Sequence, residues 1–200
     1  PSASRIAARL IEDLAEIETI EGAASDNIAA VLARAGTSID ASHGKGAAEM
    51  LNRVTLNVAM VNAGVKNNMI PSRAELVLDV RLPIGMAKAD VMPSIEAIVA
   101  RHPQATIEHG EVLEPNWCDP VHPLVDILQA NAQALTGVRP DPIVCLGMTD
   151  ARLWRYAGVP AFVYGSTTEG TAGIDESVEI ADYLHVVRTH TLSAYDYLTR

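Results

Sequence analysis

The spacing of hydrophobic residues changes along the chain, and each spacing predicts a different element. At the start, apolar residues recur every three or four positions, which predicts an amphipathic helix with the stripe Ile6, Leu10, Leu14 and Ile17. From Val54 to Met60 they recur at every second position, which predicts a half-buried strand that ends near Gly64. Residues 36–52 show no sustained period, and we expect a loop there with room for a short helix.

A second strand is predicted at 74–81, with the apolar face Ala74, Leu76, Leu78 and Val80. Arg81 lies on the opposite face together with Asp79, so it points away from the local core. A helix is predicted around 91–98, and a third strand begins at Ala105. The order helix, strand, strand, helix, strand predicts an α+β layer rich in antiparallel pairs.

Beyond a proline-dense link at 114–123, helices alternate with short, continuously apolar runs. We expect helices over about 124–135, in MTDARLWRYA and in ADYLHVVRTHTLSAYDYL, the last with Leu184, Val187 and Leu198 on one side. The apolar runs PIVCL and VPAFVYG are interpreted as buried strands. This alternation is typical of an α/β layer with a mainly parallel sheet, so we expect a domain boundary near residue 114.

Composition narrows the classes of function. With 200 residues, 48% of them hydrophobic, the chain suits one mid-sized or two small globular domains. Its 25 acidic and 15 basic residues give a net charge of -10 without a Lys/Arg cluster, so we expect no nucleic-acid or membrane partner. No apolar run approaches the roughly 20 residues that span a bilayer, and the start does not look like an export signal.

Two further features suggest where the chain works and how complete it is. Cys118 and Cys145 lack CxxC spacing and are too few for a disulfide scaffold, which favours a reducing cytoplasm. The sequence opens on a proline directly before a helix, so we expect an additional upstream part.

The first chemical candidate is the stretch NNMIPSRAELVLDVR. Pro71 restricts the residue before it to extended geometry, which places Asn68 in a bend between strands with its amide available to a ligand. Along a straight strand Arg81 would lie roughly some tens of ångströms from that bend. One small ligand could then contact both residues only if the strand curves or if a second subunit supplies one of them. The alternative interpretation is a turn amide and a surface arginine paired with Asp79 or Glu75.

Two other segments carry weaker signals. In CLGMTDARLW a buried strand runs through Gly147 into a helix that Thr149 or Asp150 opens, and such strand-to-helix turns often bind ligands. A turn glycine and a helix cap explain the same residues without a ligand. In GSTTEGTAGIDESVEI, Asp175 and Glu176 precede the last helix, which is ordinary helix-dipole chemistry or, alternatively, a paired-carboxylate site.

Three co-linear motifs together resemble a known family. NNMIPSRAELVLDVRLP, GMTDARLWRYAGVPAFVYG and GIDESVEIADY are similar, in order and separation, to the carboxyl-terminal portion of zinc-dependent metallopeptidases and amidohydrolases. That family includes acetylornithine deacetylase, succinyl-diaminopimelate desuccinylase and aminoacylase. The resemblance covers nearly the whole chain. It implies a ferredoxin-like lid and dimerisation domain at 1–113, followed at 114–200 by the distal half of a three-layer α/β catalytic domain of the zinc-exopeptidase type.

The resemblance also implies a function for individual residues. Asn68 and Arg81 match positions that hold the carboxylate of a small-molecule substrate, for which arginine offers a planar, bidentate fork. Gly147 and Thr149 match a substrate-contacting loop. The complete enzyme would be a cytoplasmic homodimer that cleaves the amide bond of an N-acyl amino acid or small peptide with water activated by two zinc ions.

Two departures from the family pattern concern the metal. The family's upstream His-x-Asp, bridging Asp and Glu-Glu motifs have no counterpart here, so we assign no catalytic residue and expect this chain alone to bind no zinc. Ala172 stands where the family has a further metal-binding His, and alanine cannot ligate zinc. Glu169 is either a substitute ligand or a solvated loop residue, and His185 and His190 diverge by more than about a hundred degrees on a helix. The alternative function is a non-catalytic, dimeric module that binds small acids or a partner.

Overall fold

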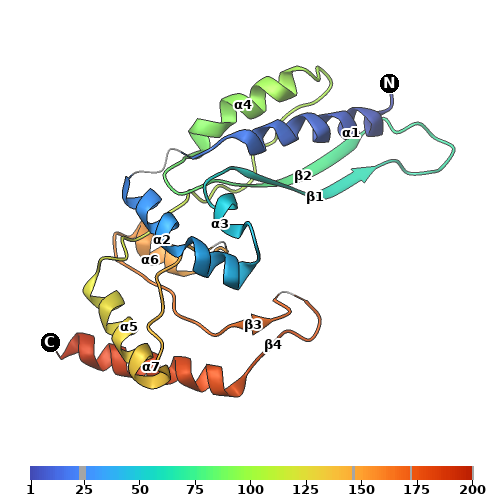
Figure 1. The fold of residues 1–200 in the computed structure, drawn as a ribbon. Helices are drawn as coiled ribbons and strands as arrows, with labels where there is room; N and C mark the ends of the chain where they lie inside the picture. Colours follow the sequence, from blue (N-terminus) through green and yellow to red (C-terminus); the bar gives the residue numbers. More distant parts are fainter. Residues whose placement is uncertain (23–25, 146, 172, 200) are drawn as a thin grey trace. The chain divides into compact units, whose positions relative to one another are not determined.

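The computed structural model describes residues 1–22, 26–145, 147–171 and 173–199 (Figure 1). The chain divides into two compact units, Pro1–Asn116 and Trp117–Arg200. Both units contain helices and strands, which confirms the expected mixed α/β class. None of the described helices has the length and apolar character that a membrane crossing requires.

The first unit is built around an antiparallel hairpin of β1 (Thr55–Ala63) and β2 (Ala74–Arg81), so both predicted strands are confirmed. In the register, the first residue of β1 pairs with the last residue of β2, and a bulge interrupts the ladder between Val58 and Met60. The loop that joins the strands therefore lies at the opposite end of the hairpin from Arg81.

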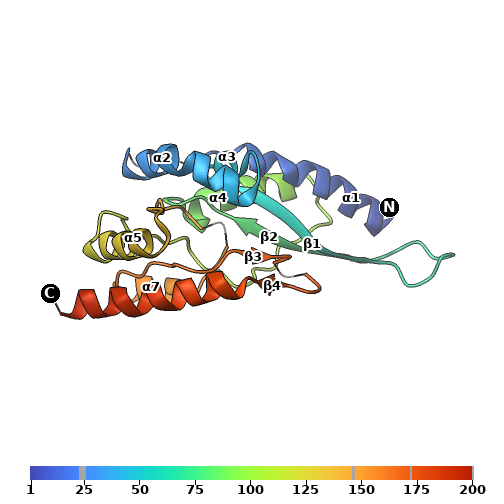
Figure 2. The same cartoon turned by 60° about the horizontal axis from the view of Figure 1, so that its bottom comes forward.

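The core of the first unit lies between the hairpin and the helices α1 (Ala3–Leu14) and α4 (Lys88–Ala100), with the 3-10 helix η1 (Ala15–Thr19) continuing α1. Figures 1 and 2 show both helices lying along the strands. The buried cluster confirms the predicted stripe and comprises Leu10, Leu14, Ile17, Val54, Val91 and Ile98. One face of the hairpin packs against it through Leu56, Leu76, Leu78 and Val80. Each fully buried side chain of this size contributes about 1.5–3 kcal/mol relative to an exposed one.

The loop predicted at 36–52 is wrong for most of its length, because α2 (Asp26–His43) and α3 (Ala47–Met50) occupy it. Gly36, Thr37 and Ser38 are poor helix formers and interrupt the apolar period. The helix nevertheless continues, since Ala35 and Ile39 are buried on either side of them. Tertiary packing here overrides local propensity.

The second unit contains α5 (Pro123–Thr136), α6 (Ala151–Tyr156), α7 (Ile180–Leu198) and the two-residue strands β3 (Thr168–Glu169) and β4 (Ser177–Val178). All three predicted helices are confirmed. The bounds of α5 follow from its sequence: the His122 Nδ1 atom accepts a hydrogen bond from the Leu124 amide at 3.2 Å, and Gly137, with φ of 78°, ends the helix.

Three predicted strands are wrong. The segment from Ala105, the described part of PIVCL and all of VPAFVYG lie outside any strand. The sheets of the described residues are two separate antiparallel pairs, β1–β2 and β3–β4, and the expected parallel sheet is not formed among them. An apolar run shows that a segment suits a strand, but a strand also needs neighbouring backbone to pair with. Ile143 and Val163 remain 42% and 56% exposed.

The last helix differs from expectation in its orientation. Leu184, Val187 and Leu198 lie on one side of α7, as predicted, but all three are exposed. The opposite side packs against α5, which lies beside α7 in Figures 1 and 2. The apolar side of this helix is therefore not the side that holds the second unit together.

Candidate functional site

Asn68 lies in the loop at the end of the hairpin, where the sequence predicted a bend. The Met69 amide donates to the Lys66 carbonyl at 3.2 Å, and this bond closes a turn with Asn68 inside it. The Pro71 carbonyl accepts from the Ala3 amide at 2.9 Å, which ties the loop to the start of α1. Asn68 itself is exposed, so its amide is presented to solvent on an anchored turn.

Arg81 is the last residue of β2, and its side chain is exposed. Its Nε atom lies 3.0 Å from Oδ2 of Asp79, and the two side chains are 60% and 45% exposed. The surface ion pair proposed as the alternative interpretation is thus present. Exposed pairs of this kind contribute only about 0–1 kcal/mol, so a ligand carboxylate could compete with Asp79 for the guanidinium.

The structure does not bring Asn68 and Arg81 together within one chain. β2 is eight residues long, and seven steps of roughly 3.3 Å give a separation of about 23 Å between its ends. Ala74 and Arg81 are the two ends of β2, and Asn68 lies in the loop beyond Ala74. A small ligand that touches both side chains would have to receive them from two copies of the chain.

Gly147 and Thr149 lie in irregular backbone before the six-residue helix α6. The Thr149 carbonyl accepts from the backbone amide and from Nη1 of Arg152, both at 3.1 Å. Gly147 has no left-handed φ, and an added Cβ would meet only Cys145 Sγ at 3.8 Å, so the backbone does not require glycine here. The role of these two residues in substrate binding stays a prediction.

The described residues contain no group of three or more His, Cys, Asp or Glu side chains that could hold a metal ion. Glu169 is exposed on β3, where it pairs with Ser177, and Ala172 lies outside the described residues. These residues therefore do not fit a zinc site, and no metal-dependent step is assigned to them.

His185 and His190 both contact Tyr164, although they diverge around α7. The His185 Nε2 atom lies 2.5 Å from the phenol oxygen, and the His190 Nε2 atom lies 2.8 Å from the carbonyl oxygen of the same residue. Burial raises the pKa of the Tyr164 phenol, and the nearby Asp182 carboxylate raises it further. The two histidines attach the segment around Tyr164 to α7.

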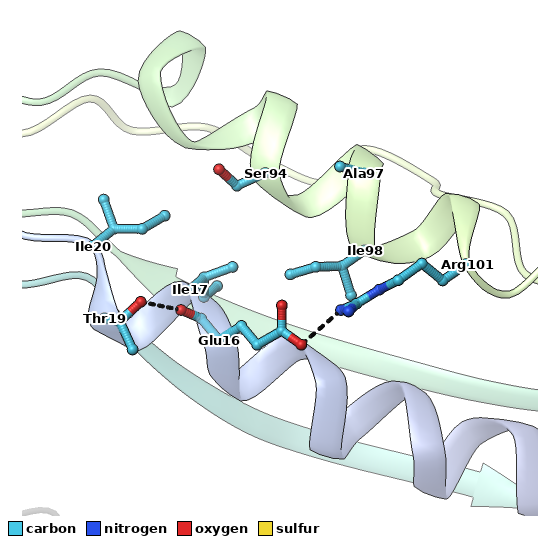
Figure 3. A pocket seen from close by; sticks show the side chains of 8 residues that line it. All are labelled: Glu16, Ile17, Thr19, Ile20, Ser94, Ala97, Ile98 and Arg101. Carbon is cyan, nitrogen blue, oxygen red and sulfur yellow. Dashed lines mark hydrogen bonds and ion pairs between the residues drawn. The ribbon is translucent and has the colours of Figure 1, made fainter.

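A groove of about 380 Å³ lies between η1 and α4, and none of the candidate substrate-binding residues Asn68, Arg81, Gly147 and Thr149 lines it (Figure 3). Its rim carries an ion pair between Arg101 Nη2 and Glu16 Oε1 at 2.9 Å. Beside it, His102 Nε2 lies 2.7 Å from Asp13 Oδ2. Sequence reasoning missed this cluster because its partners are 85 and 89 residues apart. Acidic and basic groups here offset one another, so the groove offers no evident preference for a carboxylate.

Comparison with known proteins identifies the first unit. The family model of the M20 peptidase dimerisation domain matches residues 1–106. A solved structure of an M20 family metallo-carboxypeptidase from Sulfolobus solfataricus is similar, with a TM-score of 0.66 and 18% sequence identity. The match covers 96% of this chain and 52% of that one, so the chain spans about half the length of the relative. No curated protein gives a significant match.

These matches confirm the expected fold class, a dimerisation domain followed by part of an M20-type peptidase fold. They do not distinguish between the deacetylases, desuccinylases and aminoacylases named above. The chain belongs to the M20 peptidase family, and its peptidase dimerisation domain occupies residues 1–106.

Proposed function

We propose that this chain is the lid and distal catalytic part of a metal-dependent hydrolase that cleaves the amide bond of an N-acyl amino acid or a small peptide. The observation that carries the proposal is the family match over residues 1–106. The likeness in fold to a metallo-carboxypeptidase supports it, since a carboxypeptidase acts next to a free carboxylate. The proposal includes a cytoplasmic location, in keeping with the free thiols of Cys118 and Cys145.

The contribution of this chain is to dimerise and to hold the substrate's carboxylate. Because Asn68 and Arg81 lie at opposite ends of one hairpin, we assign them to different chains of a homodimer around a shared ligand. Arg81 would exchange its ion pair with Asp79 for the substrate's carboxylate and donate two parallel hydrogen bonds to it. Asn68 would supply an amide donor from its anchored turn. Two fixed contacts orient the scissile bond, and orientation lowers the barrier to reaction.

The metal belongs to a part of the protein that these residues do not form. In the complete enzyme, two zinc ions would be held outside the described residues and would lower the pKa of bound water and polarise the amide carbonyl. We assign the residues of this chain to binding and positioning the substrate.

The test is the kinetics of the full-length protein, with Arg81→Ala compared with Arg9→Ala. Losing a charged bidentate contact of about 2 kcal/mol or more raises KM for carboxylate-bearing substrates by about 30-fold or more. Arg9 is exposed on α1, so its removal leaves KM unchanged. Two zinc ions per subunit are expected from metal analysis. Equal KM values for the two variants would show that Arg81 does not bind the substrate's carboxylate.

The alternative is a non-catalytic dimeric module that binds small acids, and it is favoured by Ala172, which stands where the family has a metal-binding His. It requires the 200-residue chain to bind an N-acyl amino acid without zinc, which isothermal titration calorimetry would detect. If none of a panel of such compounds gives detectable binding heat, the result counts against this alternative function. Both functions require a dimer, and sedimentation showing only monomer at micromolar concentration would contradict both.

A further inference from the structure

The groove between η1 and α4 has an apolar floor. Its apolar lining residues are Ile17, Ile20, Ala97 and Ile98, and we call this set the aliphatic floor. Ile17 and Ile98 belong to the buried core of the first unit, so packing holds this surface in place. The volume of about 380 Å³ lies near the lower end of the roughly 300–1,000 Å³ that small-molecule sites occupy. The groove therefore has the size and the surface for a small ligand with an aliphatic group.

One end of the groove is charged. Figure 3 shows Arg101 and the carboxylate of Glu16 near one end and Ile20 at the other. Arg101 Nη2 lies 2.9 Å from Glu16 Oε1, and the two side chains are 47% and 56% exposed. An ion pair with this much exposure is weak, and a guanidinium and a carboxylate each have hydrogen-bonding capacity beyond a single bond. Both groups can therefore contact a ligand.

The charges around this end favour a ligand that carries both signs. Asp13 Oδ2 lies 4.0 Å from Arg101 Nη2 and 2.7 Å from His102 Nε2. A ligand with only a carboxylate would be attracted by Arg101 but repelled by Glu16 and Asp13. A ligand with only an ammonium would be attracted by Glu16 but repelled by Arg101. A zwitterion can place each of its charges beside an opposite one and so avoids both repulsions.

A free α-amino acid meets this description. Its ammonium and carboxylate are bonded to the same carbon atom, so they lie side by side, as the charged groups of Glu16 and Arg101 do. The ligand would pair with them head to tail without separating the ion pair. Its side chain, attached to the same carbon, would extend along the aliphatic floor towards Ile20 and bury apolar surface there.

We propose that the groove between η1 and α4 binds a free α-amino acid with an aliphatic side chain, such as leucine. Arg101 donates hydrogen bonds to its carboxylate, Glu16 accepts from its ammonium, and the aliphatic floor contacts its side chain. Neither Asn68 nor Arg81 lines this site, and the inference does not depend on the proposed function. An N-acyl amino acid lacks the ammonium, so the groove would accept a product of the proposed reaction and reject its substrate.

The test is a titration of the 200-residue chain followed by amide NMR spectra. L-Leucine is expected to shift the amide signals of the groove residues until they saturate. N-Acetyl-L-leucine lacks the ammonium and L-leucinamide lacks the carboxylate. Each is expected to bind about tenfold more weakly or worse, because it loses one charge-assisted contact. Equal affinities for all of these compounds, or no shift with L-leucine, would overturn the proposal.

A matched pair of variants tests the charged end. Glu16→Gln keeps the shape of the side chain but removes its charge, and it is expected to weaken L-leucine binding by about tenfold or more. Glu12→Gln, at an exposed position of α1 that does not line the groove, is the control and is expected to leave the affinity unchanged. Equal affinities of the two variants would exclude Glu16 from the site.

A third variant, Ala97→Phe, tests the aliphatic floor. Ala97 is exposed, so the fold accommodates a larger side chain at this position, and that side chain would fill the groove. The variant is expected to abolish the shifts caused by L-leucine while the rest of its spectrum stays that of the folded chain. Unchanged binding would place the ligand elsewhere and contradict the proposal.

The outcomes for this site and for the proposed function can be separated. L-Leucine binding in the groove of a protein without hydrolase activity would retain the site and reject the proposed function. Hydrolase activity of the full-length protein, with L-leucine shifts confined to Asn68 and Arg81, would retain the function and reject the site in the groove.

Discussion

The two units of this chain bury their apolar residues in opposite ways. In the first, Leu14 and Ile17 are each 1% exposed and pack with the inner face of the hairpin. In the second, the most deeply buried side chains of α7 are Thr189 and Ser193, while its leucines and tyrosines face outwards. The first unit therefore has a core within its own residues. In the second, hydrogen bonds from Asn131 on α5 to Ser193 and Asp196 join the two helices, beside the buried Val125, Ile127 and Ala132 of α5.

An amphipathic pattern identifies the apolar side of a helix but does not show what covers it. The periods of α1 and of α7 both identify an apolar side, but only α1 has that side covered within the described residues. Coverage depends on which other elements a domain contains, and a local period carries no information about them. An apolar period therefore identifies one side of a helix but does not show whether that side is covered.

The largest expected effect comes from the same substitution made in both units. Leu14→Ala opens a cavity in the first core and is expected to lower the free energy of unfolding by about 2–5 kcal/mol. Leu184→Ala, on the exposed apolar side of α7, is expected to change it by less than about 0.5 kcal/mol in the 200-residue chain. Urea unfolding followed by far-UV circular dichroism measures both. Similar losses would show that Leu184 is covered within this chain.

A smaller effect is expected for the polar contact between α5 and α7. Asn131→Ala removes the hydrogen bonds to Ser193 and Asp196 and is expected to cost about 1–2 kcal/mol. Gln133→Ala, at an exposed position of α5, is the control and should be neutral. Both tryptophans, Trp117 and Trp154, lie in the second unit, so their fluorescence reports its unfolding separately. Equal results for the two variants would mean that the hydrogen bonds of Asn131 do not stabilise this unit.

The smallest effect concerns the turn between α2 and α3 in the first unit. The Asp40 carboxylate accepts a hydrogen bond from the Ala48 amide at 2.9 Å, and this bond lowers the pKa of Asp40 below its ordinary value of 3.8. A lowered folded-state pKa stabilises the turn above pH 3.8, and that stabilisation is lost as the pH falls through the folded-state value. Asp40→Asn should therefore flatten the acid limb of helix content measured by circular dichroism. An unchanged acid limb would contradict a role for this carboxylate.

Most of the first unit could be predicted from sequence because its signals are local. The stripe of α1 and the alternation in both strands are each encoded by neighbouring residues. The bend at Asn68 was predictable for the same reason, since Pro71 dictates it. Arg81 was correctly placed on the outer face, together with its alternative partner Asp79.

The rest depended on information that is not local. The separation of Asn68 from Arg81 is an exception, since the length of the strand between them predicted it and the hairpin register agrees. The ion pair of Glu16 with Arg101 joins residues that no spacing rule connects. VPAFVYG was predicted as a strand because it is apolar, although the described residues offer it no strand to pair with. Its apolar sequence favours a strand but does not identify the strand with which it would pair.

The proposed function makes this chain one part of a longer metal-dependent hydrolase, and the mass of the protein purified from its own cells tests that proposal most directly. Denaturing and native mass spectrometry should be compared on the same sample. The account predicts a polypeptide of about twice 21.3 kDa, since the relative is about twice as long, or a 21.3 kDa chain that stays bound to a second M20-type polypeptide under native conditions. A native species built only from 21.3 kDa chains would contradict it.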